Sequence, residues 1–245
     1  MTSPEDLAAT VATACRVLAA TGLVEHVLGH VSVRSGDEVL VRCRGPREAG
    51  LAYTTAADVR PVPLDLSPGP AAPGEWSPPQ ELPIHTAILR ARPEATAVVH
   101  AHPPAVVAMS LAGLPWRPIF GAYDIPAARL AADGIPVWPR AALVSTPALG
   151  AELAAFAGDR PVAVLRGHGL VSVATGPPHE AIARAVVQAF AVNTLASMTL
   201  AVCAAGGEPA AIPDEDLAAL PDLGPAFNVD TMWRHLCARA GVTTQ

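Results

Sequence analysis

Three histidines occur where their side chains can meet at one metal ion. His100 and His102 lie at the end of the apolar run 95–101, which predicts a buried strand. Side chains alternate between the two faces of a strand, so these two histidines project from the same face. His168 follows a second apolar run, 162–165, and the glycines on both sides of it let the backbone approach closely. Three imidazoles with a coordination position left for substrate are typical of a catalytic metal site.

A single buried histidine is more often a core residue than a metal ligand. The joint pattern of His-x-His at one strand end and Gly-His-Gly at another favours the metal site over that alternative. An imidazole set would bind one divalent ion, zinc or manganese, and would also accept iron(II) or cobalt(II). His85 is a further candidate ligand or neighbour of this site.

Glu81 opens a helix predicted from about residue 80 to residue 91. A carboxylate in a first helical turn is stabilised by the helix dipole, and this explanation needs no catalytic role. A carboxylate beside a metal-bound carbonyl is also what a proton shuttle requires. The position of Glu81 in the sequence leaves both explanations open.

The composition narrows the class of protein. The chain has 245 residues, of which 51% are hydrophobic, so we expect a single domain over 1–245 with a core at about 5–205 and a tail at about 206–245. All 16 basic residues are arginine, and an enzyme without lysine forms no lysine Schiff base. The net charge of −6 argues against nucleic acid and anionic membranes as partners. The four cysteines have no regular spacing, which favours reduced thiols and a cytoplasmic protein.

Periodicity predicts the elements that must hold these residues. Strands and helices mix without strict alternation, which predicts an α/β fold: a three-layer α/β/α sandwich with a largely antiparallel central sheet. The apolar stretch 180–205 still contains polar residues, so we expect a buried helix rather than a membrane span. The other predicted elements are a helix at 4–20, a hairpin of 30–34 with 38–42, a loop at 61–79, a helix at 104–111, a strand pair at 170–174 and a short helix at 231–240.

Five short motifs occur in order along the chain. They are GHVSVR at 29–34, ELPIH at 81–85, ARP at 91–93, VVHAH at 98–102 and RGHG at 166–169. Together they resemble the class II aldolase/adducin superfamily over roughly residues 5–205. The resemblance implies that His100, His102 and His168 bind the metal and that Glu81 is the acid/base. It also implies a homotetramer with active sites near the subunit interfaces.

The chain departs from the sugar-phosphate enzymes of that superfamily where they bind phosphate. His30 replaces an asparagine, RCRG at 42–45 replaces a Thr-x-x-Gly loop, and Pro-Gln at 79–80 replaces a serine pair. An arginine cluster is often a solvated face, but guanidinium groups also pair with carboxylates through two hydrogen bonds. We therefore expect a small carboxylated substrate. The cluster consists of Arg34, Arg42, Arg44 and Arg47.

This pattern is most similar to the decarboxylase branch of the superfamily, which acts on hydroxylated aromatic dicarboxylates such as 3,4-dihydroxyphthalate. The resemblance implies a metal-dependent carbon–carbon lyase, with His30, Ser32, Arg42 and Arg44 binding the substrate. One alternative is a sugar-phosphate aldolase or epimerase, which shares the step of stabilising a carbanion. A second alternative is a non-catalytic, adducin-like interaction module.

Overall fold

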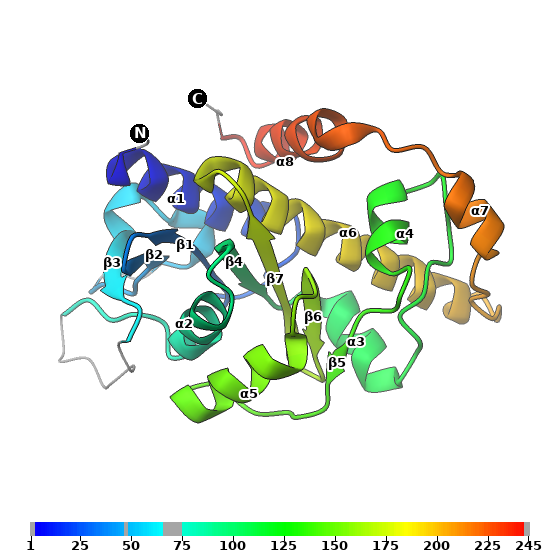
Figure 1. Ribbon diagram of the computed structural model, residues 1–245, viewed down its shortest axis with the longest axis horizontal. Helices are drawn as coiled ribbons and strands as arrows, with labels where there is room; N and C mark the ends of the chain where they lie inside the picture. Colours follow the sequence, from blue (N-terminus) through cyan, green and yellow to red (C-terminus); the bar gives the residue numbers. More distant parts are fainter. Residues whose placement is uncertain (1–2, 47–48, 66–74, 243–245) are drawn as a thin grey trace.

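A seven-stranded sheet forms the centre of the protein (Figure 1). The computed structural model describes residues 3–46, 49–65 and 75–242. The strand order is β3-β2-β1-β4-β7-β6-β5, and each neighbouring pair is antiparallel except β5 and β6, which are parallel. The strands are β1 (His30–Ser35), β2 (Glu38–Arg42), β3 (Val59–Pro63), β4 (Ala95–Ala101), β5 (Val137–Trp138), β6 (Val162–Leu165) and β7 (Gly169–Thr175).

Helices cover both faces of this sheet (Figure 1). One apolar cluster joins the first face to α1, α3, α4, α6 and α8, and a second cluster joins the other face to α2 and α5. These three layers confirm the predicted α/β/α sandwich. The α-helices are α1 (Pro4–Ala20), α2 (Leu82–Ala91), α3 (Pro104–Ala112), α4 (Ile125–Leu130), α5 (Pro147–Ala157), α6 (Pro178–Ala204), α7 (Asp214–Ala219) and α8 (Met232–Arg239). Two short 3-10 helices are η1 (Leu51–Tyr53) and η2 (Ala56–Asp58), and a π-helical segment is η3 (Ala226–Thr231).

The alternation of side chains along β1 decides which residues face the candidate site. Val31 and Val33 belong to the apolar cluster on the α1 and α6 face. His30 and Ser32 therefore point to the α2 face. In the antiparallel ladder, His30 lies directly opposite His100 of β4, which places their side chains next to each other.

Helix α1 begins where the sequence predicts it. The Ser3 hydroxyl accepts a hydrogen bond from the backbone N–H of Asp6, and the Asp6 carboxylate accepts one from the backbone of Ser3. This capping box satisfies two backbone donors at the helix end, and Pro4 fits the first helical turn.

Helix α6 is long and apolar enough to cross a membrane by length and composition alone. In the fold it packs along β4 and β7, and its buried side includes Val186, Val192 and Leu195. The core helix of a layered protein has this same composition, so the prediction of a buried helix agrees with the packing. The described residues contain no other candidate membrane span.

The proline-rich segment differs from its prediction as a loop over 61–79. Residues 59–63 form β3, the edge strand that pairs with β2. An edge strand tolerates Pro61 and Pro63 because the missing N–H groups interrupt no second ladder. Residues 66–74 of the predicted loop lie outside the described residues. The predicted strand pair at 170–174 is also wrong, because these residues form the single strand β7.

Gly169 allows β7 to approach β4 closely, because a Cβ atom at this position would lie 2.2 Å from the carbonyl oxygen of Ala101. Gly169→Ala should therefore lower the unfolding free energy by about 1–3 kcal/mol, measured by urea denaturation. Gly121→Ala is the matched control, since its Cβ would meet only side-chain tips, the nearest being Leu220 Cδ2 at 3.2 Å. Equal stability of the two variants would contradict this packing constraint.

Candidate metal centre

Two strand ends and one turn bring the three predicted histidines together. His100 is the penultimate residue of β4, and His102 follows the strand. His168 lies in the turn between β6 and β7, where its N–H donates to the carbonyl of Leu165. Gly167 has φ of +65°, a conformation that glycine adopts without strain. Its N–H donates to the hydroxyl of Ser110 at 2.9 Å, which fixes the turn.

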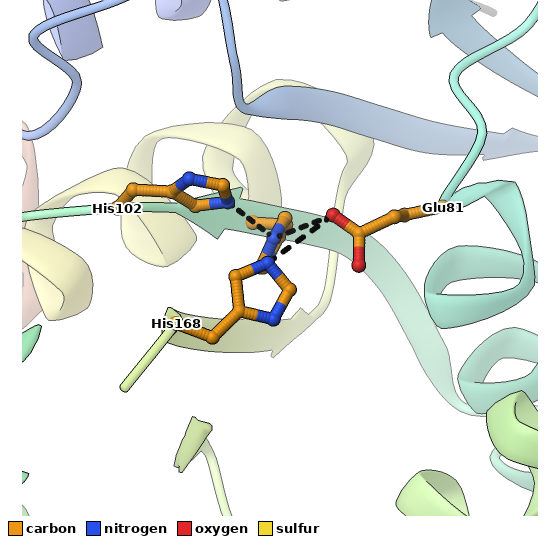
Figure 2. A group of neighbouring side chains, drawn as sticks. Glu81, His102 and His168 are labelled. Atoms are coloured by element: carbon orange, nitrogen blue, oxygen red, sulfur yellow. Dashed lines mark hydrogen bonds and ion pairs between the residues drawn. The ribbon is translucent and has the colours of Figure 1, made fainter. Parts of the chain in front are cut away.

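Four side chains converge at this point: Glu81, His100, His102 and His168. One ligand atom from each lies within 4.8 Å of every other. Figure 2 shows Glu81, His102 and His168 pointing toward one another. The Nε2 atoms of His100 and His102 are 2.8 Å apart, and Glu81 Oε2 lies 3.3 Å from Nε2 of both His100 and His168. Tetrahedral ligands at about 2.1 Å from zinc are about 3.4 Å apart, and the separations of 2.8 and 3.3 Å lie near this value, so the group could hold a divalent ion.

A hydrogen bond orients the His100 ring for ligation. The Nδ1 atom of His100 lies 2.9 Å from the carbonyl oxygen of Leu170. A carbonyl only accepts hydrogen bonds, so Nδ1 carries the proton and Nε2 keeps its lone pair. Metal-binding histidines commonly have such a partner on the second ring nitrogen.

Glu81 is held by contacts other than those of a helix cap. It occupies the N-cap position of α2, but its side chain caps no backbone donor of that helix. Its Oε1 atom accepts the N–H of Val144 at 3.0 Å, while Oε2 faces the histidines. Burial would raise the pKa of the Glu81 carboxyl, but hydrogen bonds and charge from His100 and His168 in their protonated forms lower it overall. The carboxylate is therefore ionised and ready to bind a cation or accept a proton. Nothing in the sequence pattern points to Val144.

A second layer of polar side chains lies beside the centre. His85 is fully buried, its Nε2 atom lies 2.6 Å from Nδ1 of His30, and its Nδ1 atom lies 2.6 Å from Oγ of Ser32. The ring centroids of His30 and His100 are 5.1 Å apart. Burial lowers the pKa of His30 and lowers that of His85 to about 3. His30 and Ser32, which the sequence predicts to bind the substrate, lie beside the centre, and their role in binding stays a prediction.

The predicted arginine cluster is not brought into the centre as a group. Arg42 shares the α1 face of β2 with Leu40, and its Nε donates to the hydroxyl of Thr54. Arg34 donates to the backbone carbonyls of Leu89 and Ala95, so it ties β1 to the end of α2. The backbone of Arg44 pairs with that of Ser77. Arg47 lies outside the described residues.

An apolar cavity of about 360 Å³ adjoins the centre at His102. Val107 and Leu111 of α3 and Leu28 of the loop before β1 contribute to its wall. Leu111 is 60% exposed and Leu28 is 41% exposed, so apolar surface borders the cavity. A flat apolar molecule could lie here while its polar groups reach the centre.

Comparison with known proteins assigns this fold and site to a family. The chain matches the Class II Aldolase and Adducin N-terminal domain over residues 9–200 and belongs to that family. It is 57% identical over 235 residues to 3,4-dihydroxyphthalate decarboxylase of Terrabacter sp. (strain DBF63), covering 94% of this chain and 95% of the relative. It is 48% identical over 244 residues to the enzyme of that name from Rhodococcus jostii (strain RHA1), covering 98% of both chains.

Solved structures agree with the family. L-Fuculose-1-phosphate aldolase from Thermus thermophilus superposes with a TM-score of 0.66 at 26% identity, covering 82% of this chain and 96% of that one. L-Fuculose 1-phosphate aldolase from Glaciozyma antarctica PI12 superposes with a TM-score of 0.73 at 19% identity, covering 99% of this chain and 96% of that one, and supports the fold alone.

Removing one imidazole should empty the centre, because the remaining side chains leave too few ligands. We expect His100→Ala and His168→Ala to lower the metal content from about one ion per chain to under about a tenth. The measurement is elemental analysis of protein purified without chelators. His235→Ala, an exposed histidine of α8, is the matched control and should keep the ion. Full metal content in the His100 or His168 variant would contradict the ligand set.

Acid should destabilise the metal-free protein through the buried histidines. The pKa of His85 is about 6.5 in the unfolded chain and about 3 in the fold. Between these pH values the unfolded state binds more protons than the folded state. The contribution of neutral His85 to the unfolding free energy is therefore complete above about pH 6.5 and is lost as the pH falls toward 3. His85→Gln should reduce this loss of unfolding free energy by up to about 1 kcal/mol per pH unit between about pH 6 and pH 5.

Urea denaturation at several pH values measures that slope. His235→Gln is the matched control, because this histidine is exposed on α8. If the slope of the His85→Gln variant equals that of the wild type, His85 does not carry the pH dependence.

Proposed function

We propose that this chain is a metal-dependent decarboxylase of 3,4-dihydroxyphthalate or a closely similar hydroxylated aromatic dicarboxylate. The observation that carries the proposal is the 57% identity, over 94% of the chain, to a decarboxylase of that substrate. The group of Glu81 and three histidines, whose ligand atoms lie within 4.8 Å of one another, supports it. We assign His100, His102 and His168 as the metal ligands. The apolar cavity at His102 suits an aromatic ring, whose carboxylates would reach the polar centre.

His100, His102 and His168 would hold the divalent ion, which would supply a Lewis acid for an oxygen-bearing ring. Glu81 is ionised and anchored by the N–H of Val144, so its other oxygen is free to move a proton. It accepts the proton of a ring hydroxyl and delivers it to the ring carbon as the bond to the carboxylate breaks and carbon dioxide leaves. The proton and the electron pair of the broken bond both remain with the product.

The finer features of the proposal concern the ion, the substrate contacts and the assembly. Zinc or manganese fits an imidazole set with one carboxylate nearby. We propose that His30 contributes to substrate binding and that Ser32 does so through His85. The predicted roles of Arg42 and Arg44 in substrate binding remain predictions, and Arg42 lies on the opposite face of β2, beside Thr54. We also propose one domain with a core at 5–205 and a tail at 206–245, assembled as a homotetramer in the cytoplasm and acting in aromatic catabolism. Light scattering in solution tests the tetramer.

Two substrates test the proposed reaction. The purified protein, loaded in turn with zinc and manganese, is incubated with 3,4-dihydroxyphthalate and with L-fuculose 1-phosphate. We expect carbon dioxide from the first and no aldol cleavage of the second. Aldol cleavage without carbon dioxide release would replace the proposal by the sugar-phosphate aldolase. Inactivity on both, in a protein that binds no ion, would support the interaction module.

Glu81→Gln should slow the decarboxylation by about 10²- to 10⁴-fold, the usual contribution of a general acid–base group. The amide keeps the size of the carboxylate but carries no transferable proton, and three imidazoles remain to hold the ion. The rate of carbon dioxide release and the metal content are measured together, with Glu152→Gln as the control carboxylate on α5. An unchanged rate in the Glu81 variant would remove Glu81 from the mechanism.

A further inference from the structure

Three buried polar side chains form a hydrogen-bonded chain beside the candidate metal centre. Ser32 Oγ lies 2.6 Å from His85 Nδ1, and His85 Nε2 lies 2.6 Å from His30 Nδ1. Ser32 and His85 are 0% exposed and His30 is 6% exposed. Water therefore has little access to these contacts, and the protons must be arranged among the three groups themselves.

The hydroxyl of Ser32 sets the direction of this chain. It carries one hydrogen, and among the described residues His85 is its hydrogen-bond partner. If the hydroxyl donates to Nδ1 of His85, its hydrogen is satisfied. If it only accepted from His85, a buried O–H would have no acceptor, which is unfavourable. His85 therefore accepts at Nδ1 and carries its own proton on Nε2.

The proton on His85 also determines which ring nitrogen of His30 is protonated. His85 Nε2 donates to Nδ1 of His30, so a neutral His30 carries its proton on Nε2. Burial favours the neutral form of both rings, since it lowers the pKa of each. Across the residues that the structure describes, His30 Nε2 has no hydrogen-bond partner. It is also not one of the fully buried polar atoms that lack a partner, so some of its surface is exposed. It therefore remains accessible to a ligand.

The accessible N–H lies next to the ligands of the ion. His30 and His100 are direct cross-strand neighbours, and their ring centroids are 5.1 Å apart. With the opposite proton arrangement, His30 Nε2 would present a lone pair, which repels an anionic oxygen. His30 is not part of the group of residues that could hold the ion. A donor in this position suits an anionic oxygen, because a carboxylate only accepts hydrogen bonds.

We propose that Ser32 and His85 are positioning residues that hold His30 as an Nε2–H donor to a carboxylate of the substrate. This inference rests on the proposed function, because it assigns one polar contact to the dicarboxylate. Ser32 and His85 do not touch the reacting atoms. They act by keeping the proton of His30 on Nε2, so that this nitrogen donates a hydrogen bond.

The first test reads the proton positions without any turnover. The zinc-loaded protein is labelled with ¹⁵N in its histidines, and the ring nitrogens of His30 and His85 are identified by the loss of their signals in the His30→Gln and His85→Gln variants. We expect protonated Nε2 and unprotonated Nδ1 in both rings. A proton on Nδ1 of His30 would overturn the proposal.

The second test separates substrate binding from the chemical step. Ser32→Ala should raise KM for 3,4-dihydroxyphthalate by about 3- to 10-fold, since the donor is no longer held, and should leave kcat and metal content nearly unchanged. His30→Gln should raise KM by about 10- to 100-fold, the range expected for a hydrogen bond to a charged group. Ser32→Thr keeps the hydroxyl and should restore KM toward the wild-type value.

Ser172→Ala is the matched control, because Ser172 is equally buried on β7 and donates to Gln188 rather than to a histidine. Equal KM values for Ser32→Ala and Ser172→Ala would overturn the positioning role. If the wild type releases no carbon dioxide from the dicarboxylate, the proposed function fails, while the ¹⁵N measurement still decides the orientation of His30.

Discussion

The centre of this protein brings electron-rich atoms together in a place with little water. Three imidazole nitrogens and a carboxylate oxygen lie within 4.8 Å of one another, and His100 and Glu81 are almost completely buried. Lone pairs that face each other repel, and buried charge without a partner is unfavourable. A divalent cation removes both costs at once. The four side chains are therefore arranged as a group that could hold such a cation.

The sheet meets this requirement through its register. The pairing of β4 with β7 sets Leu170 opposite Ala101, so the Leu170 carbonyl can accept the Nδ1 proton of His100. The pairing of β1 with β4 sets His30 beside His100. Because side chains alternate along a strand, a shift of one residue in either ladder would turn these groups to the opposite face. The same backbone hydrogen bonds that stabilise the sheet therefore orient the ligands.

Much of the fold, and the grouping of Glu81 with the three histidines, could be predicted from the sequence, because both depend on local patterns. The run 95–101 and the run 162–165 form strands with the predicted bounds, and the capping residue Ser3 begins α1. Strand β3 could not be predicted, since its pairing with β2 outweighs the local preference of its prolines. The anchor of Glu81 at Val144 also depends on contact between residues 63 positions apart.

The arginines show the limit of a pattern taken alone. The sequence does not show which face of β2 carries Arg42, and only the packing of Leu40 with the α1 cluster places it on the α1 face. For His85, the sequence indicated a ligand or a neighbour of the centre. The structure gives it two hydrogen bonds to other side chains and leaves it outside the ligand group.

X-ray absorption spectroscopy at the zinc edge of the loaded protein tests the central claim most directly. The account predicts one ion per chain with nitrogen and oxygen ligands at about 2.0–2.2 Å, together with the outer-shell scattering of three imidazole rings. Sulfur ligands at about 2.3 Å, or the scattering of a single ring, would contradict it.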